Sequence, residues 1–184
     1  MAFDGTKPAN ASALVSAEMR ANFQDLDTRL KPLATFQGTV GNVGAGEDTL
    51  ASFSIPAAKL PSNGDSVRGV FWGKSANNAN AKTLRARLLE GVNNVVLISA
   101  TLTVSEAGHW MLGFVAMRTG ATTFRGMGQM NAGPTNGQVT RSVGNVTSSS
   151  TASWANAVEA RLTGEATADN DITVEGGYLV LAGV

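Results

Sequence analysis

The sequence contains no cysteine and only one histidine among its 184 residues. Without cysteine the chain can form neither a disulfide nor a thiolate metal site, and a cysteine nucleophile is excluded. With His109 as the only histidine, Ser-His-Asp catalysis and zinc sites built from several histidines also lack support. We therefore expect a protein that is not an enzyme, that holds no cofactor and no metal ion, and in which His109 is structural.

Charge is scarce as well, since only 15% of the residues are charged and 14 basic residues balance 14 acidic ones. This composition shows no basic footprint for nucleic acid or for an anionic membrane. No segment approaches the roughly 20 consecutive apolar residues that span a bilayer, and the N-terminus lacks the apolar core of a signal peptide. We expect no nucleic-acid partner and no membrane insertion.

What the chain does contain is glycine, 21 residues in all, and a series of period-2 segments beyond Ala34. Glycine-bounded segments that alternate apolar and polar residues are typical of an antiparallel β-sandwich. The fold class that we expect is all-β, a jelly-roll-like antiparallel β-sandwich over residues 35–184, preceded by an N-terminal extended arm and one short α-helix. The expected strands are Thr35–Val43, Thr49–Ile55, Ser66–Lys74, Lys82–Leu89, Val95–Thr103, His109–Arg118, Thr122–Met130, Gln138–Val143, Trp154–Leu162 and Ile172–Ala182.

Three of these segments carry finer expectations. In Lys82–Leu88 the apolar residues Leu84, Ala86 and Leu88 alternate with polar ones, so they should share one buried face. Residues 177–184 are apolar on both faces, which predicts a central strand or a strand covered by another subunit. The two glycines of the Arg125-Gly-Met-Gly stretch predict a bulge or a close backbone approach.

Residues 1–34 form a separate N-terminal segment in this interpretation. Gly5 and Pro8 favour an extended arm, and Ser16–Lys31 is an amphipathic helix that ends before Pro32. Apolar residues spaced 4, 3, 4 and 3 apart form a heptad stripe on it. This stripe docks either on its own β-domain or, the interpretation we favour, in a short bundle around a symmetry axis or in a groove of a neighbour. The predicted interface residues are Phe3, Met19, Phe23, Leu26, Leu30 and Leu33.

Two groups of side chains are candidates for chemistry. One group is oxygen-rich, as Ca²⁺ sites are, but lacks the spacing of a calcium loop, so we expect a solvated turn. It consists of Glu165, Asp169, Asp171 and Glu175. The other group could stack sugars, but its members all fall inside expected strands, where core packing is the commoner use. It consists of Trp72, Trp110, Trp154 and Tyr178.

Several stretches resemble tailed-bacteriophage virion proteins of the tail-fibre and head-fibre type. Residues 1–10 (MAFDGTKPAN) with 14–20 (LVSAEMR) are similar to the short N-terminal attachment segment of phage appendage proteins. Residues 55–68 through 79–87 are similar to a recurring phage β-sandwich that trimerises. Residues 117–123 (MRTGATT) are similar to the paired strands of that module.

The resemblance implies a homotrimeric jelly roll that its N-terminal helix and arm fasten to the virion. The function expected is that of a non-enzymatic structural component, a knob or short fibre on the tail or a decoration of the capsid. The alternative is a receptor-binding, carbohydrate-binding module at a tail-fibre tip. The expected partners are further copies of this chain, other phage structural proteins through residues 1–34, and, in the alternative, a host surface glycan. The expected location is the virion, assembled in the cytoplasm of a host bacterium.

Overall fold

The computed structural model describes residues 20–21, 24, 32–102, 108–134, 140–148 and 153–182. The chain divides into two units, residues 1–31 and residues 32–184. In the first unit Arg20, Ala21 and Gln24 are helical, and the rest of the expected arm and helix lies outside the described residues. The boundary between the units falls a few residues before the boundary at residue 34 that the sequence suggested.

In the second unit the described residues form ten β-strands and two antiparallel sheets. Each expected strand overlaps one observed strand, so the all-β sandwich is confirmed. The strands of the six-stranded sheet, in spatial order, are β1 (Ala34–Gly41), β10 (Ile172–Ala182), β3 (Ser66–Ser75), β6 (Gly108–Arg118), β7 (Phe124–Pro134) and β8 (Thr140–Ser148). The strands of the four-stranded sheet are β2 (Gly46–Ile55), β9 (Val158–Ala166), β4 (Lys82–Glu90) and β5 (Asn93–Leu102).

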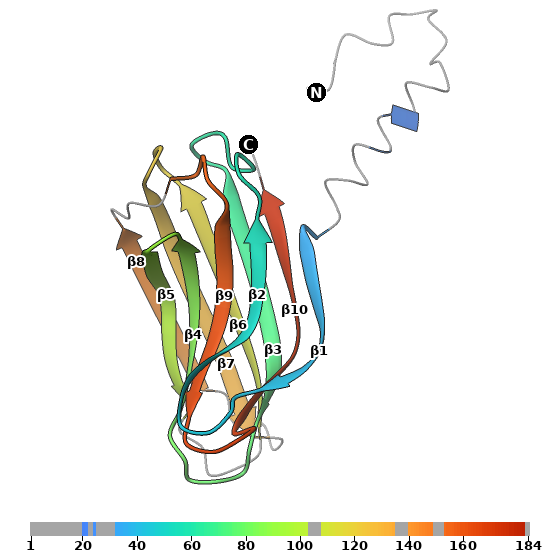
Figure 1. Ribbon diagram of the computed structural model, residues 1–184, viewed down its shortest axis with the longest axis vertical. Coiled ribbons are helices and arrows are strands. Elements are labelled where there is room, and N and C mark those ends of the chain that lie inside the picture. Colours follow the sequence, from blue (N-terminus) through green and yellow to red (C-terminus); the bar gives the residue numbers. More distant parts are fainter. Residues whose placement is uncertain are drawn as a thin grey trace, which may run out of the picture. The chain divides into compact units, whose positions relative to one another are not determined.

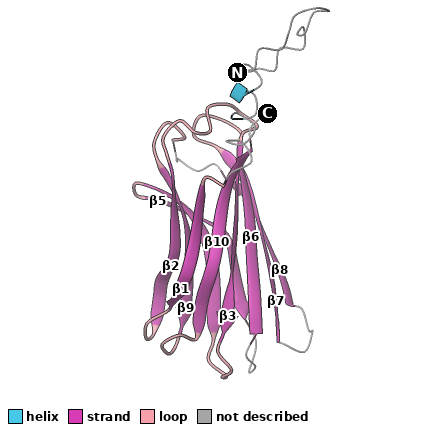
Figure 2. Ribbon diagram, turned by 90° about the vertical axis from the view of Figure 1, so that its right-hand side faces the viewer, coloured by secondary structure: helices cyan, strands magenta, loops and turns pink. Residues whose placement is uncertain are grey.

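The pairing of these strands is nested. The first strand pairs with the last, β2 with β9, β3 with β6 and β4 with β5, while β7 and β8 extend one edge of the six-stranded sheet. Figures 1 and 2 show the two sheets as two layers, with the connecting loops gathered at both ends of the strands. β10 lies between β1 and β3, so the prediction of a central strand near the C-terminus is confirmed.

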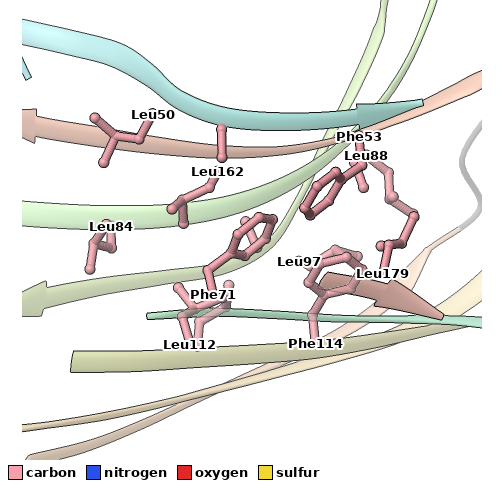
Figure 3. Packing of buried hydrophobic residues seen from close by; sticks show 14 of the residues in the cluster. Leu50, Phe53, Phe71, Leu84, Leu88, Leu97, Leu112, Phe114, Leu162 and Leu179 are labelled. Atoms are coloured by element: carbon pink, nitrogen blue, oxygen red, sulfur yellow. The ribbon is translucent and has the colours of Figure 1, made fainter. Parts of the chain in front are cut away.

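The core fills the space between the two sheets (Figure 3). Phe71 of β3 is fully buried, and its ring stacks on Phe53 of β2 across the sandwich, with 5.5 Å between ring centroids. On the other side the Phe71 ring meets Phe114 of β6 at 6.3 Å. The inward face predicted for β4 is confirmed, because its three apolar residues are at most 2% exposed. Burial of these side chains on both inner faces is what holds the sheets together.

Two glycines of β7 allow close contact between the sheets. A Cβ on Gly126 would lie 2.7 Å from Cδ2 of Leu97, and a Cβ on Gly128 would lie 2.5 Å from Cβ of Ile98. Leu97 and Ile98 both belong to β5 of the opposite sheet. The close backbone approach that the sequence predicted here is therefore confirmed.

One expected strand starts too early. The sequence placed Trp154 in a strand, but β9 begins only at Val158. Before it the chain turns, with the amide of Asn156 donating to the carbonyl of Ser153 at 3.0 Å. The alternation of apolar and polar residues that is regular from Val158 onward was extended back to Trp154, whereas the Trp154 side chain enters the core from this turn.

No helix in the part of the chain that the structure describes is long and apolar enough to cross a membrane.

Candidate functional site

The outer face of the six-stranded sheet carries an unusual group of exposed apolar side chains. The side chains of Trp72, Met111, Met117 and Met127 are 40%, 48%, 40% and 51% exposed. They come from the neighbouring strands β3, β6 and β7, and the register places Trp72 opposite Met111. Exposed apolar side chains gathered on one face of a sheet make that face a candidate binding surface.

A glycine leaves room for the Trp72 ring to lie on the sheet. Gly176 of β10 is its cross-strand partner, and a Cβ at that position would lie 2.2 Å from Cζ2 and 2.5 Å from Cε2 of the indole. The ring therefore covers the Gly176 backbone where any other residue would place a side chain. Tyr178 lies beside it, with 6.3 Å between ring centroids and planes tilted by 55°. We call the Trp72 ring the platform, and the tilted Tyr178 ring borders it on one side.

The core packing predicted for the aromatic residues is confirmed for two of the tryptophans. Trp110 and Trp154 are 2% and 3% exposed, and each indole N–H donates to a backbone carbonyl, Lys74 at 3.0 Å and Thr123 at 3.3 Å. For Trp72 the prediction was wrong. Phe71 occupies the inner face at this point, so the adjacent Trp72 side chain points outward.

A signal for this orientation is present in the sequence. Trp72 shares its parity along the strand with Arg68 and Lys74, both exposed, whereas Val67 and Phe71 share the other parity and are fully buried. Because successive side chains of a strand point to opposite faces, the two charged residues identify the solvent side of β3.

Basic residues surround the apolar group. Arg68, Lys74, His109 and Arg125 are exposed on β3, β6 and β7. The acidic residue described on this face, Glu175, is paired with Lys74, whose Nζ lies 2.6 Å from its Oε1.

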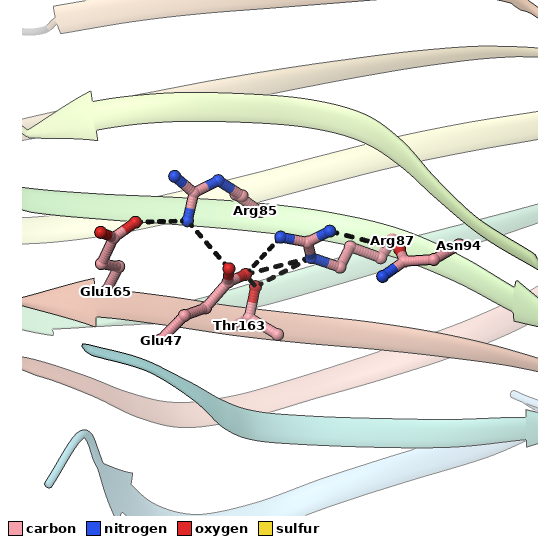
Figure 4. Close-up of polar contacts among 6 residues, drawn as sticks. All are labelled: Glu47, Arg85, Arg87, Asn94, Thr163 and Glu165. Carbon is pink, nitrogen blue, oxygen red and sulfur yellow. Dashed lines mark hydrogen bonds and ion pairs between the residues drawn. The ribbon is translucent and has the colours of Figure 1, made fainter. Parts of the chain in front are cut away.

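The outer face of the four-stranded sheet is different, because its charges are paired with one another (Figure 4). Nη1 of Arg85 lies 2.7 Å from Glu165 and 3.3 Å from Glu47. Arg87 donates to Glu47 through Nη2 at 2.5 Å, and the Thr163 hydroxyl donates to the same carboxylate. Partial burial acts to raise the pKa of Glu47, but these hydrogen bonds and the two arginine charges outweigh it and lower the pKa.

A shallow groove of about 460 Å³ lies on the four-stranded sheet. Ser52 and Ser54 of β2 and the Glu159–Arg161 pair of β9 supply its polar lining. The guanidinium of Arg161 donates to both oxygens of Glu159, at 2.8 and 2.9 Å. The charged groups of this groove are thus already paired with each other.

The acidic group singled out in the sequence does not converge on one point. Glu165 and Glu175 pair with arginine and lysine on opposite outer faces, and Asp169 accepts the amide of Gly44. We expected Asp171 to lie in a solvated turn, and this was wrong, because the residue is only 1% exposed. No group of three or more His, Asp or Glu side chains suited to a metal ion occurs in the described parts of the chain.

Asp171 instead organises a buried network at one end of the sandwich. Its carboxylate accepts hydrogen bonds from the side chains of Asn78 and Asn80 and from the amide of Ala168. Burial acts to raise the pKa of Asp171, and these hydrogen bonds outweigh it and hold the pKa below its ordinary value. Sequence reasoning missed this network, since the two asparagines lie about ninety residues away, in the β3–β4 loop.

Lys82 completes the network from the first position of β4. Lys82 is 1% exposed, and its ammonium group donates to the carbonyls of Asn78 and Asn80 at 3.1 Å each and to Oδ1 of Asn78 at 2.7 Å. All three ammonium protons thereby have acceptors, as a buried charge requires. The network therefore links the loops to one another through hydrogen bonds, and its charged groups are hydrogen-bonded to neighbouring groups of the chain.

Most of the predicted interface residues lie outside the described part of the chain: Phe3, Met19, Phe23, Leu26 and Leu30. Leu33 is described. Its amide donates to the carbonyl of Leu179 at 2.7 Å, and its side chain packs against the sandwich core. The structure thus places Leu33 at the start of the six-stranded sheet.

No family model and no curated protein matches this chain. Among solved structures it is similar to the CBM2 module of the evolved Dit of Lactobacillus casei BL23 phage J-1, with a TM-score of 0.36 and 12% sequence identity. The similarity covers 70% of this chain and 66% of that one, so this chain spans just under two thirds of its length. A similarity this weak does not define a family.

Proposed function

We propose that this protein is a non-enzymatic structural component of a tailed-phage virion. It forms a homotrimeric knob or short fibre that its N-terminal segment fastens to the tail or the capsid, and its sandwich is a jelly roll. The nested strand order supports the jelly roll, since two Greek keys produce this pairing. The observation that carries the proposal is the division of the chain into an N-terminal unit and a separate sandwich.

The heptad stripe supplies the reason for a trimer. An isolated helix of about 16 residues is marginal in water, so its apolar stripe needs a surface to pack against. Three copies around an axis bury the a and d positions of one another. The sandwich draws its stability from its own core, in which Phe71 and its neighbours join the two sheets.

The test of this proposal is a pair of charged substitutions in the stripe of the full-length protein. Phe23→Asp with Leu26→Asp places two carboxylates in the seam, and we expect the trimer to dissociate while thermal unfolding of the sandwich barely changes. The matched control is Ala21→Asp with Thr28→Asp, which adds the same charge away from the stripe. If the seam variant unfolds the whole chain, the helix belongs to the sandwich core and the proposal of an attachment segment is wrong.

A second function, carbohydrate binding at a receptor-recognising tip, is favoured by one specific observation. Trp72 is 40% exposed, whereas Trp110 and Trp154 are buried. An exposed indole that lies over a glycine presents a flat aromatic face on which a sugar ring can stack. We expect acrylamide to quench one of the three tryptophans in the full-length protein. Three shielded tryptophans would contradict carbohydrate binding at this face.

A further inference from the structure

We infer that the outer face of the six-stranded sheet binds an anionic oligosaccharide, with Trp72 as the stacking platform and Arg68 and Arg125 as the groups that hold its acidic substituents. This inference rests on the carbohydrate-binding function proposed above and specifies its ligand class. The ligand is an oligosaccharide that carries carboxylate or phosphate groups.

The aromatic half of the site is preformed. Gly176 lets the Trp72 indole lie over the backbone of β10, and Tyr178 stands beside it at a tilt of 55°. A sugar ring has one face made of C–H groups, which stacks on an indole, and edges made of hydroxyls. Met111, opposite Trp72 on β6 and 48% exposed, extends the apolar surface under a second sugar ring.

The charge on this face argues for an anion. Neither Arg68 nor Arg125 forms an ion pair with any side chain that the structure describes. The arginines of the opposite sheet behave differently, since Arg85, Arg87 and Arg161 all pair with glutamates. The full chain has equal numbers of acidic and basic residues. The unpaired positive charge of this face is therefore a property of the face and not of the chain as a whole.

The two arginines are placed to act together. Arg68 lies opposite Val115 of β6, and Arg125 of β7 lies opposite Met117 of β6. They therefore flank β6, one strand to either side and offset by two residues along it, which places their backbones roughly 12 Å apart. A guanidinium group binds a carboxylate or a phosphate through two parallel hydrogen bonds. Arg68 and Arg125 can therefore donate hydrogen bonds to one acidic group from opposite sides. Arg68 lies four residues along β3 from Trp72, about 13 Å, a distance that an oligosaccharide can span.

The test uses the full-length protein and a glycan array that holds neutral, carboxylated and phosphorylated oligosaccharides, followed by titration calorimetry with the best ligand of each kind. We expect binding to the acidic members of the array and weaker affinity at higher salt, because exposed charges are screened. The carboxylated and phosphorylated members show which acidic group is preferred.

The variants separate the two halves of the site. Trp72→Ala is expected to weaken the binding of any glycan at least tenfold. The milder Trp72→Phe keeps an aromatic ring and is expected to weaken binding less. Arg68→Gln and Arg125→Gln are each expected to weaken binding of acidic glycans about tenfold. The charge-matched control is Lys59→Gln, an exposed lysine in the loop between β2 and β3, which is expected to change nothing.

The possible failures are distinguishable. Equal binding of neutral and acidic glycans, unchanged in both arginine variants, would overturn the anionic ligand and leave carbohydrate binding standing. No binding of any glycan would overturn both. If Trp72→Ala leaves the sandwich folded but dissociates the trimer, a second copy covers this face and the inference is wrong.

Discussion

Two adjacent residues of β3 should respond very differently to truncation. Phe71 is fully buried and joins the two sheets through rings of Phe53 and Phe114, whereas the Trp72 side chain lies on the outer face and is 40% exposed. Phe71→Ala removes a core ring and leaves a cavity, which costs about 3–5 kcal/mol. Trp72→Ala removes a partly covered ring without leaving a cavity, so about 1–2 kcal/mol is expected.

Thermal unfolding of the full-length variants measures this difference. For a chain of this size each kcal/mol lowers the Tm by about 2–4 °C, so Phe71→Ala should lower it by roughly 6–20 °C and Trp72→Ala by only a few degrees. The comparison tests the register of β3, because a shift by one residue would exchange the two faces. Equal destabilisation by the two variants, or a larger loss for Trp72→Ala, would refute the assignment of Trp72 to an open outer face.

Two further predictions concern the polar networks. The pKa of Glu47 is lower in the folded chain than its ordinary value of 4.5, so its contribution to stability is present above that pH and is lost as the pH falls through the folded pKa. Glu47→Gln should therefore flatten the acid limb of a stability–pH curve measured by urea unfolding, and an unchanged limb would contradict the role of Glu47. Asp171→Asn turns an amide N–H₂ toward the asparagine donors and should cost about 1–3 kcal/mol in urea unfolding. The exposed Asp169→Asn is the control, and equal effects of the two variants would argue against the buried network.

The strands could be predicted from the sequence because their signal is local. Alternation in β4 and the two-sided apolar pattern of β10 follow directly from the geometry of a strand, and glycine punctuation separated one strand from the next. The turn at Trp154 escaped prediction, since a large buried side chain can enter a core from a turn as well as from a strand. Trp154 packs on Phe124, with 5.8 Å between ring centroids, and this tertiary contact places its side chain in the core. The local sequence pattern does not reveal such a contact.

The candidate site was predictable only in part. That Trp72 faces outward follows from the charged Arg68 and Lys74 at the same parity, a local pattern. The platform itself depends on Gly176, about a hundred residues away in the sequence and adjacent only through the pairing of β3 with β10. The buried network of Lys82 and Asp171 depends in the same way on loops that only the fold brings together. Such contacts have no signature in a single sequence.

The measurement that tests the central claim most directly is the mass of the full-length protein in solution, determined by light scattering at micromolar concentration. A homotrimeric virion component predicts a mass three times that of the 18.9 kDa chain. A mass equal to that of one chain would contradict the proposed assembly, and a stable dimer would contradict the trimer while leaving an interface to be explained.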